Sequence, residues 1–239
     1  MSGAGLAVRD LTVRRGGSTI VRDVSLQARP AAVTVLLGAN GAGKTTLLEA
    51  ISGVIPAAGG EVLLDDAPLG PLGRRERARR GLAHVEQGRT AFATLTVEEN
   101  LRAAAADRDA VEAGFALFPE LRPRRDTPAG LLSGGEQQML VLARALAMRP
   151  KALLVDELSL GLAPAVVQRL MTVLGELARQ GVALLVVEQY AGLILEVGAH
   201  AYVMARGRIV YDGPCEPLRE STDILRGAYL AADVAGGAR

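Results

Sequence analysis

The stretch Gly38-Ala-Asn-Gly-Ala-Gly-Lys-Thr-Thr46 determines how the rest of the chain is interpreted. It follows Val33-Thr-Val-Leu-Leu37, a β-branched apolar run that is typical of a buried strand. It precedes Leu47-Leu-Glu-Ala-Ile-Ser52, which can continue as a helix until Gly53 and Pro56 end it. In such a turn from strand to helix, backbone N–H groups converge and the helix N-terminus attracts negative charge. The pattern therefore predicts a phosphate-binding loop.

The residue types in this loop suit a nucleoside triphosphate. Gly38 and Gly43 let the backbone turn with its N–H groups facing inward. Lys44 is expected to reach the β- and γ-phosphates, and the Thr45 hydroxyl is expected to ligate Mg²⁺. The predicted nucleotide contacts of the loop are Gly38, Asn40, Gly41, Gly43, Lys44, Thr45 and Thr46. The alternative is a glycine-rich turn that only connects a strand to a helix, and the complete set of fixed positions argues against it.

The composition is that of a globular protein with a sizeable core. The chain has 239 residues, of which 49% are hydrophobic and 22% are charged. The 27 basic and 26 acidic residues leave a net charge of +1, so charge alone does not indicate a nucleic-acid partner. Only 3% of the residues are aromatic and none is Trp, which weakens models in which single-stranded bases stack on the protein.

We also find no pattern of secretion or membrane insertion. The single cysteine, Cys215, excludes an internal disulfide framework and fits a reducing cytosol. No run approaches the roughly 18 apolar residues of a membrane span. The first five residues lack the basic and apolar regions of a signal peptide. We therefore expect any association with a membrane to come through a partner.

Strands and helices alternate around the phosphate loop. Apolar runs and turn residues predict strands over 6–13, 20–26, 33–37, 59–66, 82–87, 152–156 and 182–187, and a hairpin over 202–212. Helical patterns cover 47–52, 137–148 and 164–179, and the basic run 74–80 is interpreted as a solvated helix face. His84 is expected to be a satisfied sheet residue, and His200 a surface or packing residue.

The predicted fold class is therefore α/β, a three-layer P-loop NTPase core. We expect one domain, in which residues 1–91 and 131–239 form a RecA-like core with an N-terminal antiparallel β subdomain. Residues 92–130 differ in character: Thr96-Val-Glu-Glu99 has the form of a capping box, and Pro119, Pro123 and Pro128 divide the remainder. We interpret 92–130 as an inserted α-helical subdomain.

Two further segments carry residues suited to catalysis. Asp156 and Glu157 follow an apolar strand, and open α/β sheets bind their ligands at the carboxyl ends of strands. We expect Asp156 to hold Mg²⁺ through water and Glu157 to polarise the attacking water as a general base. In Leu132-Ser-Gly-Gly-Glu-Gln-Gln138, a second capping box opens a helix at a second anion site, formed by Ser133 and the following glycines. This site would grip the γ-phosphate of a facing subunit, whereas the simpler alternative is an ordinary helix cap.

At this point the chain resembles the ATP-binding cassette ATPases over nearly its whole length. The phosphate loop, Gln87, the signature 132–138 and Asp156-Glu157 occur in the order and spacing of that family. The resemblance implies ATP hydrolysis in a head-to-tail dimer, with ATP held between one phosphate loop and the other chain's signature. It also implies that Gln87 contacts Mg²⁺ or the attacking water and couples to a membrane partner. The signature residues implied to bind nucleotide are Ser133, Gly134, Gly135 and Glu136.

More narrowly, the chain looks like the ATPase subunits of branched-chain amino-acid importers. This rests on Glu86-Gln-Gly-Arg89, Leu95-Thr-Val-Glu-Glu-Asn100, Leu132–Leu140, Ser159-Leu-Gly-Leu-Ala-Pro164, Val187-Glu-Gln189 and Ala228-Tyr-Leu230. The implied partners are a second cassette ATPase, identical or different, membrane permease subunits and, indirectly, an extracytoplasmic binding protein. The implied location is the inner face of the cell membrane. The Gln87 loop and Arg122, Arg124 and Arg125 would form the surface that docks the permease.

Several positions depart from the general family pattern. Arg15 stands where many members stack an aromatic ring on adenine, and a guanidinium can also stack on a base. Leu158 replaces a usual Pro, which we expect to loosen the loop that aims Glu157. Gln189 occupies the position of a catalytic histidine and can bond a γ-phosphate without taking up a proton. With Ala163 in place of an aspartate, these changes suggest slow or asymmetric hydrolysis.

Two other functions compete with a transporter motor. One is a soluble ATP-binding cassette protein that acts on nucleic acid or ribosomes, but the coiled coils, zinc modules or second cassette of such relatives do not occur in this sequence. The other is a phosphate-loop kinase or GTPase, and the signature 132–138 counts against it. We therefore expect a transporter ATPase, with no nucleic-acid partner.

Overall fold

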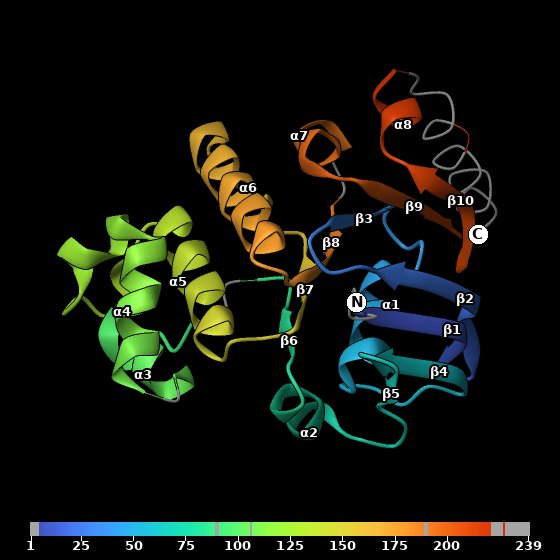
Figure 1. Cartoon of the computed structure of the whole chain (residues 1–239), viewed down its shortest axis with the longest axis horizontal. Coiled ribbons are helices and arrows are strands. Elements are labelled where there is room, and N and C mark those ends of the chain that lie inside the picture. Colours follow the sequence, from blue (N-terminus) through green and yellow to red (C-terminus); the bar gives the residue numbers. More distant parts are fainter. Residues whose placement is uncertain (1–4, 89–90, 106, 189–190, 221–226, 228–239) are drawn as a thin grey trace.

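The computed structural model describes residues 5–88, 91–105, 107–188, 191–220 and 227. Figure 1 shows three parts side by side: a group of helices, a central sheet with helices around it, and a second sheet near the N-terminus. The central sheet has six strands in the order β10-β9-β3-β8-β7-β6. Its strands are β3 (Val33–Leu37), β6 (Leu82–Val85), β7 (Ala152–Asp156), β8 (Ala183–Val187), β9 (His200–Ala205) and β10 (Arg208–Pro214).

Five strands of the central sheet are parallel, and only the edge strand β10 runs antiparallel to its neighbour. Strands β3, β7 and β8 are buried along their whole length, which is why the sequence shows continuous apolar runs there. Because the strands are parallel, the segments that follow β3, β6, β7 and β8 all leave the sheet at the same edge. This edge carries the phosphate loop, Gln87 and Asp156.

The second sheet is antiparallel, with the strand order β2-β1-β4-β5. Its strands are β1 (Leu6–Arg15), β2 (Ser18–Ala28), β4 (Gly59–Leu64) and β5 (Ala67–Pro68). Gly16 and Gly17 make the turn between β1 and β2 with positive φ angles of 55° and 83°, which glycine adopts without strain. The predicted N-terminal antiparallel subdomain is thus confirmed, with β1 and β2 longer and β4 shorter than the sequence pattern indicated.

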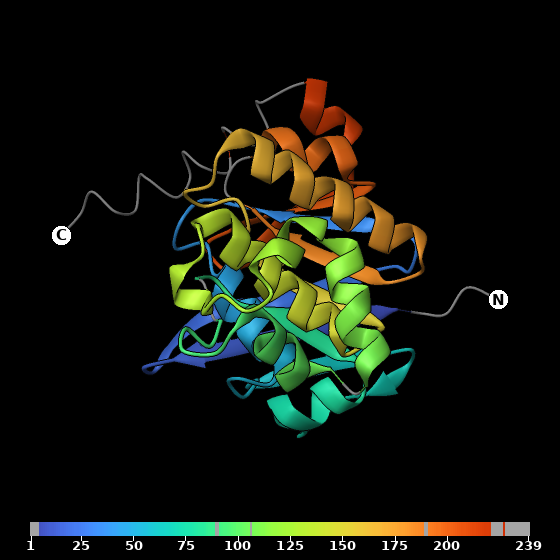
Figure 2. The same ribbon diagram turned by 90° about the vertical axis from the view of Figure 1, so that its left-hand side faces the viewer.

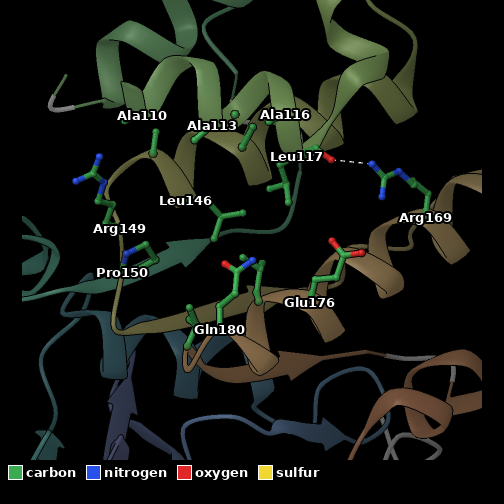
Figure 3. Close-up of a pocket in the computed structure, with 15 residues that line it drawn as sticks. Ala110, Ala113, Ala116, Leu117, Leu146, Arg149, Pro150, Arg169, Glu176 and Gln180 are labelled. Carbon is green, nitrogen blue, oxygen red and sulfur yellow. Dashed lines mark hydrogen bonds between the residues drawn. The ribbon is translucent and has the colours of Figure 1, made fainter. Parts of the chain in front are cut away.

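A group of helices projects from the other side of the core, and Figure 2 shows it in front of the central sheet. It contains α3 (Val97–Ala104), α4 (Arg108–Leu117), α5 (Gly134–Ala147) and the 3₁₀ turns η1 (Pro119–Arg124) and η2 (Ala129–Leu131). Phe115, Phe118 and Leu121 are fully buried within it. The inserted helical subdomain is therefore confirmed as a feature of the fold. Between α4, α5 and α6 (Pro164–Arg179) lies a cavity of about 730 Å³ (Figure 3).

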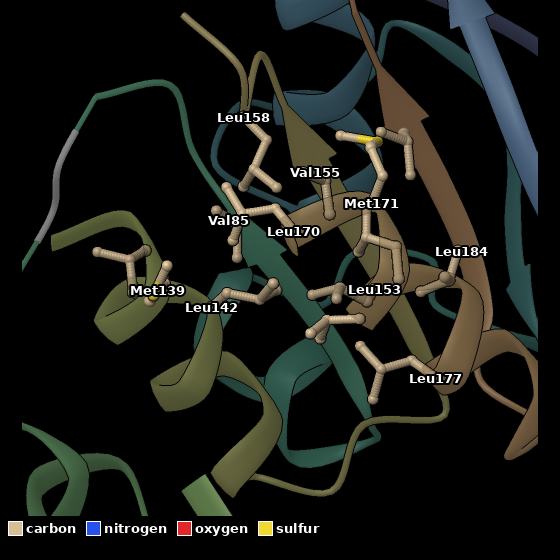
Figure 4. Close-up of a cluster of buried hydrophobic side chains, with 14 of the residues drawn as sticks. Val85, Met139, Leu142, Leu153, Val155, Leu158, Leu170, Met171, Leu177 and Leu184 are labelled. Atoms are coloured by element: carbon tan, nitrogen blue, oxygen red, sulfur yellow. The ribbon is translucent and has the colours of Figure 1, made fainter. Parts of the chain in front are cut away.

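The apolar core lies on both faces of the central sheet. Leu142 of α5 and Leu170 and Leu177 of α6 gather on the face that Leu153 and Val155 of β7 present (Figure 4). On the opposite face, alternate strand residues pack in one cluster with α1 (Lys44–Ser52) and the antiparallel sheet. The remaining helices are α2 (Arg74–Arg79), α7 (Ala191–Val197) and α8 (Glu216–Glu220). This confirms the three-layer α/β architecture.

Two sequence predictions about this fold are only partly right. The run 74–80 forms helix α2 and its other arginines are exposed, but Arg77 is buried rather than solvated, because its guanidinium donates to four backbone carbonyls. His84 accepts or donates at Nδ1 to the Ser52 hydroxyl at 3.0 Å, as expected of a satisfied sheet residue. Its buried Nε2 has no hydrogen-bond partner, however. Neither feature is visible in a local pattern of residue types.

Within the described ranges, no helix combines the length and the apolar character that crossing a membrane requires.

Candidate active site

A cleft of about 600 Å³ opens at the carboxyl edge of the central sheet. It is lined by Arg15, Ile20, Asn40, Gly41, Gly43, Lys44, Thr45, Thr46, Gln87, Glu157 and Leu160. Most of these residues were predicted from the sequence, although they come from segments far apart in the chain. Ile20 and Leu160 were not predicted, because an apolar side chain at a site has no distinctive sequence signal. The cleft is therefore the candidate site.

Glycine is required in the phosphate loop for steric reasons. A Cβ on Gly38 would lie 2.3 Å from the Met204 carbonyl oxygen, so the loop can pass β9 only without a side chain there. Gly43 has φ of 107° and is the residue before the first turn of α1. Its left-handed conformation aims the free N–H groups of the helix N-terminus into the loop. The local sequence thus builds an anion site.

The ammonium of Lys44 is hydrogen-bonded to the backbone of this loop. Its side chain is only 5% exposed, and its ammonium donates to the carbonyl oxygens of Gly38 at 2.8 Å and Ala39 at 3.2 Å. Burial lowers the pKa of Lys44, whereas the nearby carboxylates of Glu157 and Asp156 act in the opposite direction. These two partners are neutral carbonyl groups, which compensate a buried positive charge less well than an anion does. The site therefore favours an anionic ligand.

Asp156 has the environment of a cation ligand. It ends β7, is 1% exposed, and apart from the nearby Thr45 hydroxyl its carboxylate oxygens have no hydrogen-bond partner. Burial raises the pKa of Asp156 to about 6; the hydroxyl of Thr45 and the charge of Lys44 oppose the rise, and the charge of Glu157 adds to it. A buried carboxylate with so few partners costs free energy that a divalent cation removes, since oxygen ligands suit Mg²⁺. Asp156 and the Thr45 hydroxyl therefore fit a magnesium site.

Glu157 and Gln87 are in direct contact in the cleft. Gln87 Nε2 donates to Glu157 Oε2 at 2.6 Å. Glu157 adopts a φ of 47°, which is unusual for a residue other than glycine, and its N–H donates to the Val187 carbonyl at 3.0 Å. The next residue, Leu158, is buried in the core and anchors this segment. The two polar groups thus share one end of the cleft, where both can reach a water molecule or a cation.

Glu188 is a buried carboxylate beside this site that the sequence analysis did not single out. Its two oxygens accept hydrogen bonds from the Ser159 N–H at 3.1 Å and the Ser159 hydroxyl at 2.6 Å. Burial raises the pKa of Glu188. A signal was available, because Glu188 follows the apolar strand β8 as Asp156 ends β7. Glu188 therefore fixes the segment after Glu157.

Arg15 lies at the rim of the cleft, at the end of β1. Its side chain is 54% exposed, and its guanidinium forms an ion pair with Glu49 Oε2 of α1 at 2.8 Å. This contact holds the planar guanidinium beside the phosphate loop. The position is compatible with stacking on a base, as expected from the sequence.

The signature residues are not part of this cleft. Ser133 Oγ accepts from the Glu136 N–H at 3.3 Å, and Glu136 Oε2 accepts from the Ser133 N–H at 2.8 Å, so the capping box is complete. A Cβ on Gly135 would lie 3.0 Å from Val166, which explains the small residue there. Ser133, Gly134, Gly135 and Glu136 open α5, and none of them lines the cleft. Within one chain, the two predicted anion sites are thus separate.

Some of the predicted features lie outside the described residues. They are Gln189, Arg89 and the segment 228–230. The three arginines expected at a docking surface are described, and each is ion-paired: Arg122 with Glu112, Arg124 with Glu136, and Arg125 with Glu98.

The larger cavity of Figure 3 differs in character from the cleft. Ala110, Ala113 and Ala116 of α4 line one wall, and Leu146 and Pro150 line another. It contains none of the predicted site residues. Volume alone does not identify a site, and the converging polar groups favour the smaller cleft.

Comparisons with known proteins agree with this arrangement. A family model described as ABC transporter matches residues 21–159. The high-affinity branched-chain amino acid transport ATP-binding protein BraG of Pseudomonas aeruginosa is 40% identical over 216 residues, which are 88% of this chain and 92% of that protein. The lipopolysaccharide export system ATP-binding protein LptB of Escherichia coli K12 is 32% identical over 96% of this chain and 98% of that protein. A crystal structure of an ATP-binding cassette of an ABC transporter in its ADP conformation has a TM-score of 0.84 at 24% identity, over 95% of this chain and 98% of that one.

Proposed function

The chain belongs to the ABC transporter family, and from this premise we propose that it is the ATPase subunit that drives uptake of branched-chain or related amino acids. It is the ATP-binding subunit of an ABC transporter, and the reaction that it catalyses is ATP hydrolysis. The family resemblance noted in the sequence is confirmed. The cargo is the part that we propose.

The relatives support an importer more strongly than an exporter. BraG, named for branched-chain amino acid transport, is 40% identical, whereas LptB, named for lipopolysaccharide export, is 32% identical. The sequence motifs that resemble branched-chain importers point the same way. Export of a lipid is the second candidate, because the similarity to LptB extends over 96% of the chain.

The residues of the cleft have assignable roles toward ATP and Mg²⁺. The backbone of the phosphate loop and Lys44 would bind the phosphates, while Arg15 would stack on the base. Thr45, Asp156 and Gln87 would hold Mg²⁺, which neutralises charge that develops on the phosphates. Glu157 would accept the proton of the attacking water, and the proposed role of Gln189 is to bond the γ-phosphate. The observation that carries these roles is that the buried Lys44 and Glu157 both line the cleft, with the Asp156 carboxylate close to Lys44.

The separation of the signature from the cleft supports a dimer. Because the second anion site of the chain lies outside its own cleft, it is available to a second chain. We propose a head-to-tail pair in which Ser133, Gly134, Gly135 and Glu136 close the site of the partner, either a copy or a different cassette ATPase. Two incomplete halves then form a site only when ATP joins them.

The remaining partners follow from the transporter class. We propose that the Gln87 loop and the face of Arg122, Arg124 and Arg125 dock permease subunits, which hold the chain at the inner face of the membrane. An extracytoplasmic binding protein would supply the cargo indirectly. In the proposed domain organisation, a core of 1–91 and 131–239 with the insertion 92–130, the three arginines belong to the insertion and the Gln87 loop to the core. No nucleic acid is part of the proposal.

Purification of the tagged chain from its native cells in mild detergent tests the proposal. Mass spectrometry should identify membrane permease subunits, and a binding protein encoded with them should bind a branched-chain amino acid. Recovery of lipopolysaccharide-export components would favour the second candidate. Recovery of ribosomes or nucleic-acid enzymes without any permease would contradict both transporter assignments.

A further inference from the structure

Helix α2 contacts the far end of the phosphate-loop helix through a buried arginine. Arg77 is 7% exposed, and its Nη1 donates to the carbonyl oxygens of Ala50 at 2.9 Å and Ile51 at 2.6 Å. Both carbonyls lie in the last turn of α1, where a helix leaves acceptors without partners. The remaining N–H groups of Arg77 donate to Leu72 at 2.7 Å and Gly70 at 2.9 Å. The cation therefore fastens α1 to α2 at the negative end of the α1 dipole.

The packing around this contact leaves little freedom. A Cβ on Gly53 would lie 2.9 Å from Arg77 Nε and 3.0 Å from the backbone nitrogen of Arg74. Helix α2 thus lies directly on the turn that ends α1. His84 of β6 bonds Ser52 at 3.0 Å, so the strand that leads to Gln87 is attached to the same end of α1.

A second arginine of α2 contacts the segment that carries Gln87. Arg74, the first residue of α2, forms an ion pair with Glu86. Glu86 directly precedes Gln87, and Gln87 donates to Glu157. A continuous series of contacts therefore runs from the end of α1 through α2 to Gln87 and Glu157.

We propose that Arg74 and Arg77 are positioning residues that transmit movements of α1 to Gln87. The inference rests on the roles proposed above for Gln87 and Glu157. Helix α1 has nine residues, and its first residue, Lys44, contacts the phosphates in the proposed function. Because a short helix moves as a rigid unit, a ligand that shifts its first turn also shifts the carbonyls that Arg77 holds. Arg74 then passes this shift to the loop that carries Gln87.

Hydrogen exchange of the backbone amides of residues 86–88 tests this transmission directly. Binding of a non-hydrolysable ATP analogue should change their exchange rates in the wild-type chain. In Arg74→Gln the change should be lost, although the analogue still binds with an affinity within about threefold of wild type, because Arg74 does not line the cleft and a partly exposed ion pair contributes little. Arg75→Gln is the matched control, because Arg75 is the next, exposed residue of α2 and should respond as wild type does. An unchanged response in Arg74→Gln would overturn the proposal.

A kinetic cycle separates positioning from a general loss of structure. Arg74→Gln should lower kcat for ATP hydrolysis about tenfold, with KM nearly unchanged, because misplacement of a catalytic group slows the chemical step. In a Gln87→Ala background the same substitution should have less than about a twofold effect, since the two residues act through one contact. Arg77→Lys should behave as Arg74→Gln does. Equal losses in both backgrounds would contradict the inference, whereas absence of hydrolysis in wild type with a normal exchange response would count against the proposed reaction instead.

Discussion

Among single residues, Glu157 is the one on which the chemistry depends most directly. Its φ of 47° and its backbone hydrogen bond to Val187 direct its carboxylate into the cleft beside Gln87. The buried Leu158 and the pair Ser159–Glu188 secure the following residues. The loop is therefore fixed by packing at Leu158, where the family resemblance implies a proline, and the contacts of this segment give no support to the expected loosening.

Glu157→Gln should abolish hydrolysis while preserving binding. The amide cannot accept a proton from water, so we expect the rate to fall by about 10²–10⁴-fold. Binding of a fluorescent ATP analogue should stay close to the wild-type value, because the side chain keeps its size. Glu176→Gln, at the separate cavity, is the control and should leave both quantities unchanged. Full hydrolysis by Glu157→Gln would show that another group is the base.

His84 should make the stability of the chain depend on pH. Burial, with help from Arg74, lowers its pKa from 6.5 to about 4. Between these values the unfolded chain binds a proton that the folded chain does not, so the free energy of unfolding falls as pH is lowered from 6.5 to 4. The full effect amounts to about 3 kcal/mol. Urea unfolding of His84→Gln at pH 7.5 and 4.5 should show a smaller difference than wild type, and an equal difference would refute this assignment.

At the scale of elements, two helices begin with a capping box, but only one of them is proposed to bind an anion. Thr96 opens α3 and Ser133 opens α5, each in a reciprocal capping box with a glutamate three residues later. A capping box satisfies N–H groups that the first turn leaves free. Only the second box carries two glycines whose N–H groups remain available to an anion.

Alanine substitutions at the two caps should therefore agree in stability and differ in activity. Thr96→Ala and Ser133→Ala should each lower the free energy of unfolding by about 1 kcal/mol. Only Ser133→Ala should also lower the rate of ATP hydrolysis per folded chain. Thermal unfolding and steady-state kinetics on the same samples measure both. Equal activity in the two variants would mean that Ser133 is a cap and nothing more.

A feature of this fold could be predicted from the sequence when it depends on residues that are close together in the chain. The strands, the caps at Thr96 and Ser133 and the phosphate loop were predictable, because apolar periodicity and capping depend on residues near one another in the chain. The bond between Gln87 and Glu157 spans 70 residues, and Arg77 reaches Ile51 across 26. Such contacts exist only after the sheet has brought distant segments together. The same is true of the carboxylates that pair with Arg122, Arg124 and Arg125.

At the scale of the whole molecule, the separation of the two anion sites supports the proposed two-chain site. The phosphate loop, Gln87 and Glu157 line the cleft. The signature instead opens helix α5 and lines no part of the cleft. In the proposed dimer both the phosphate loop and the signature at the start of α5 are needed, since each supplies one anion site. The account therefore requires that hydrolysis depends on two chains.

The most direct test mixes two inactive variants. Lys44→Ala should not bind ATP but keeps its signature, and Ser133→Arg binds ATP but cannot close a partner's site. Each variant alone should be inactive under conditions where the wild-type chain hydrolyses ATP. Random pairing of equal amounts gives about half mixed dimers, each with one intact site, so the mixture should regain about a quarter of wild-type activity. A mixture that stays as inactive as its components, although both are folded and pair with wild type, would contradict the two-chain site.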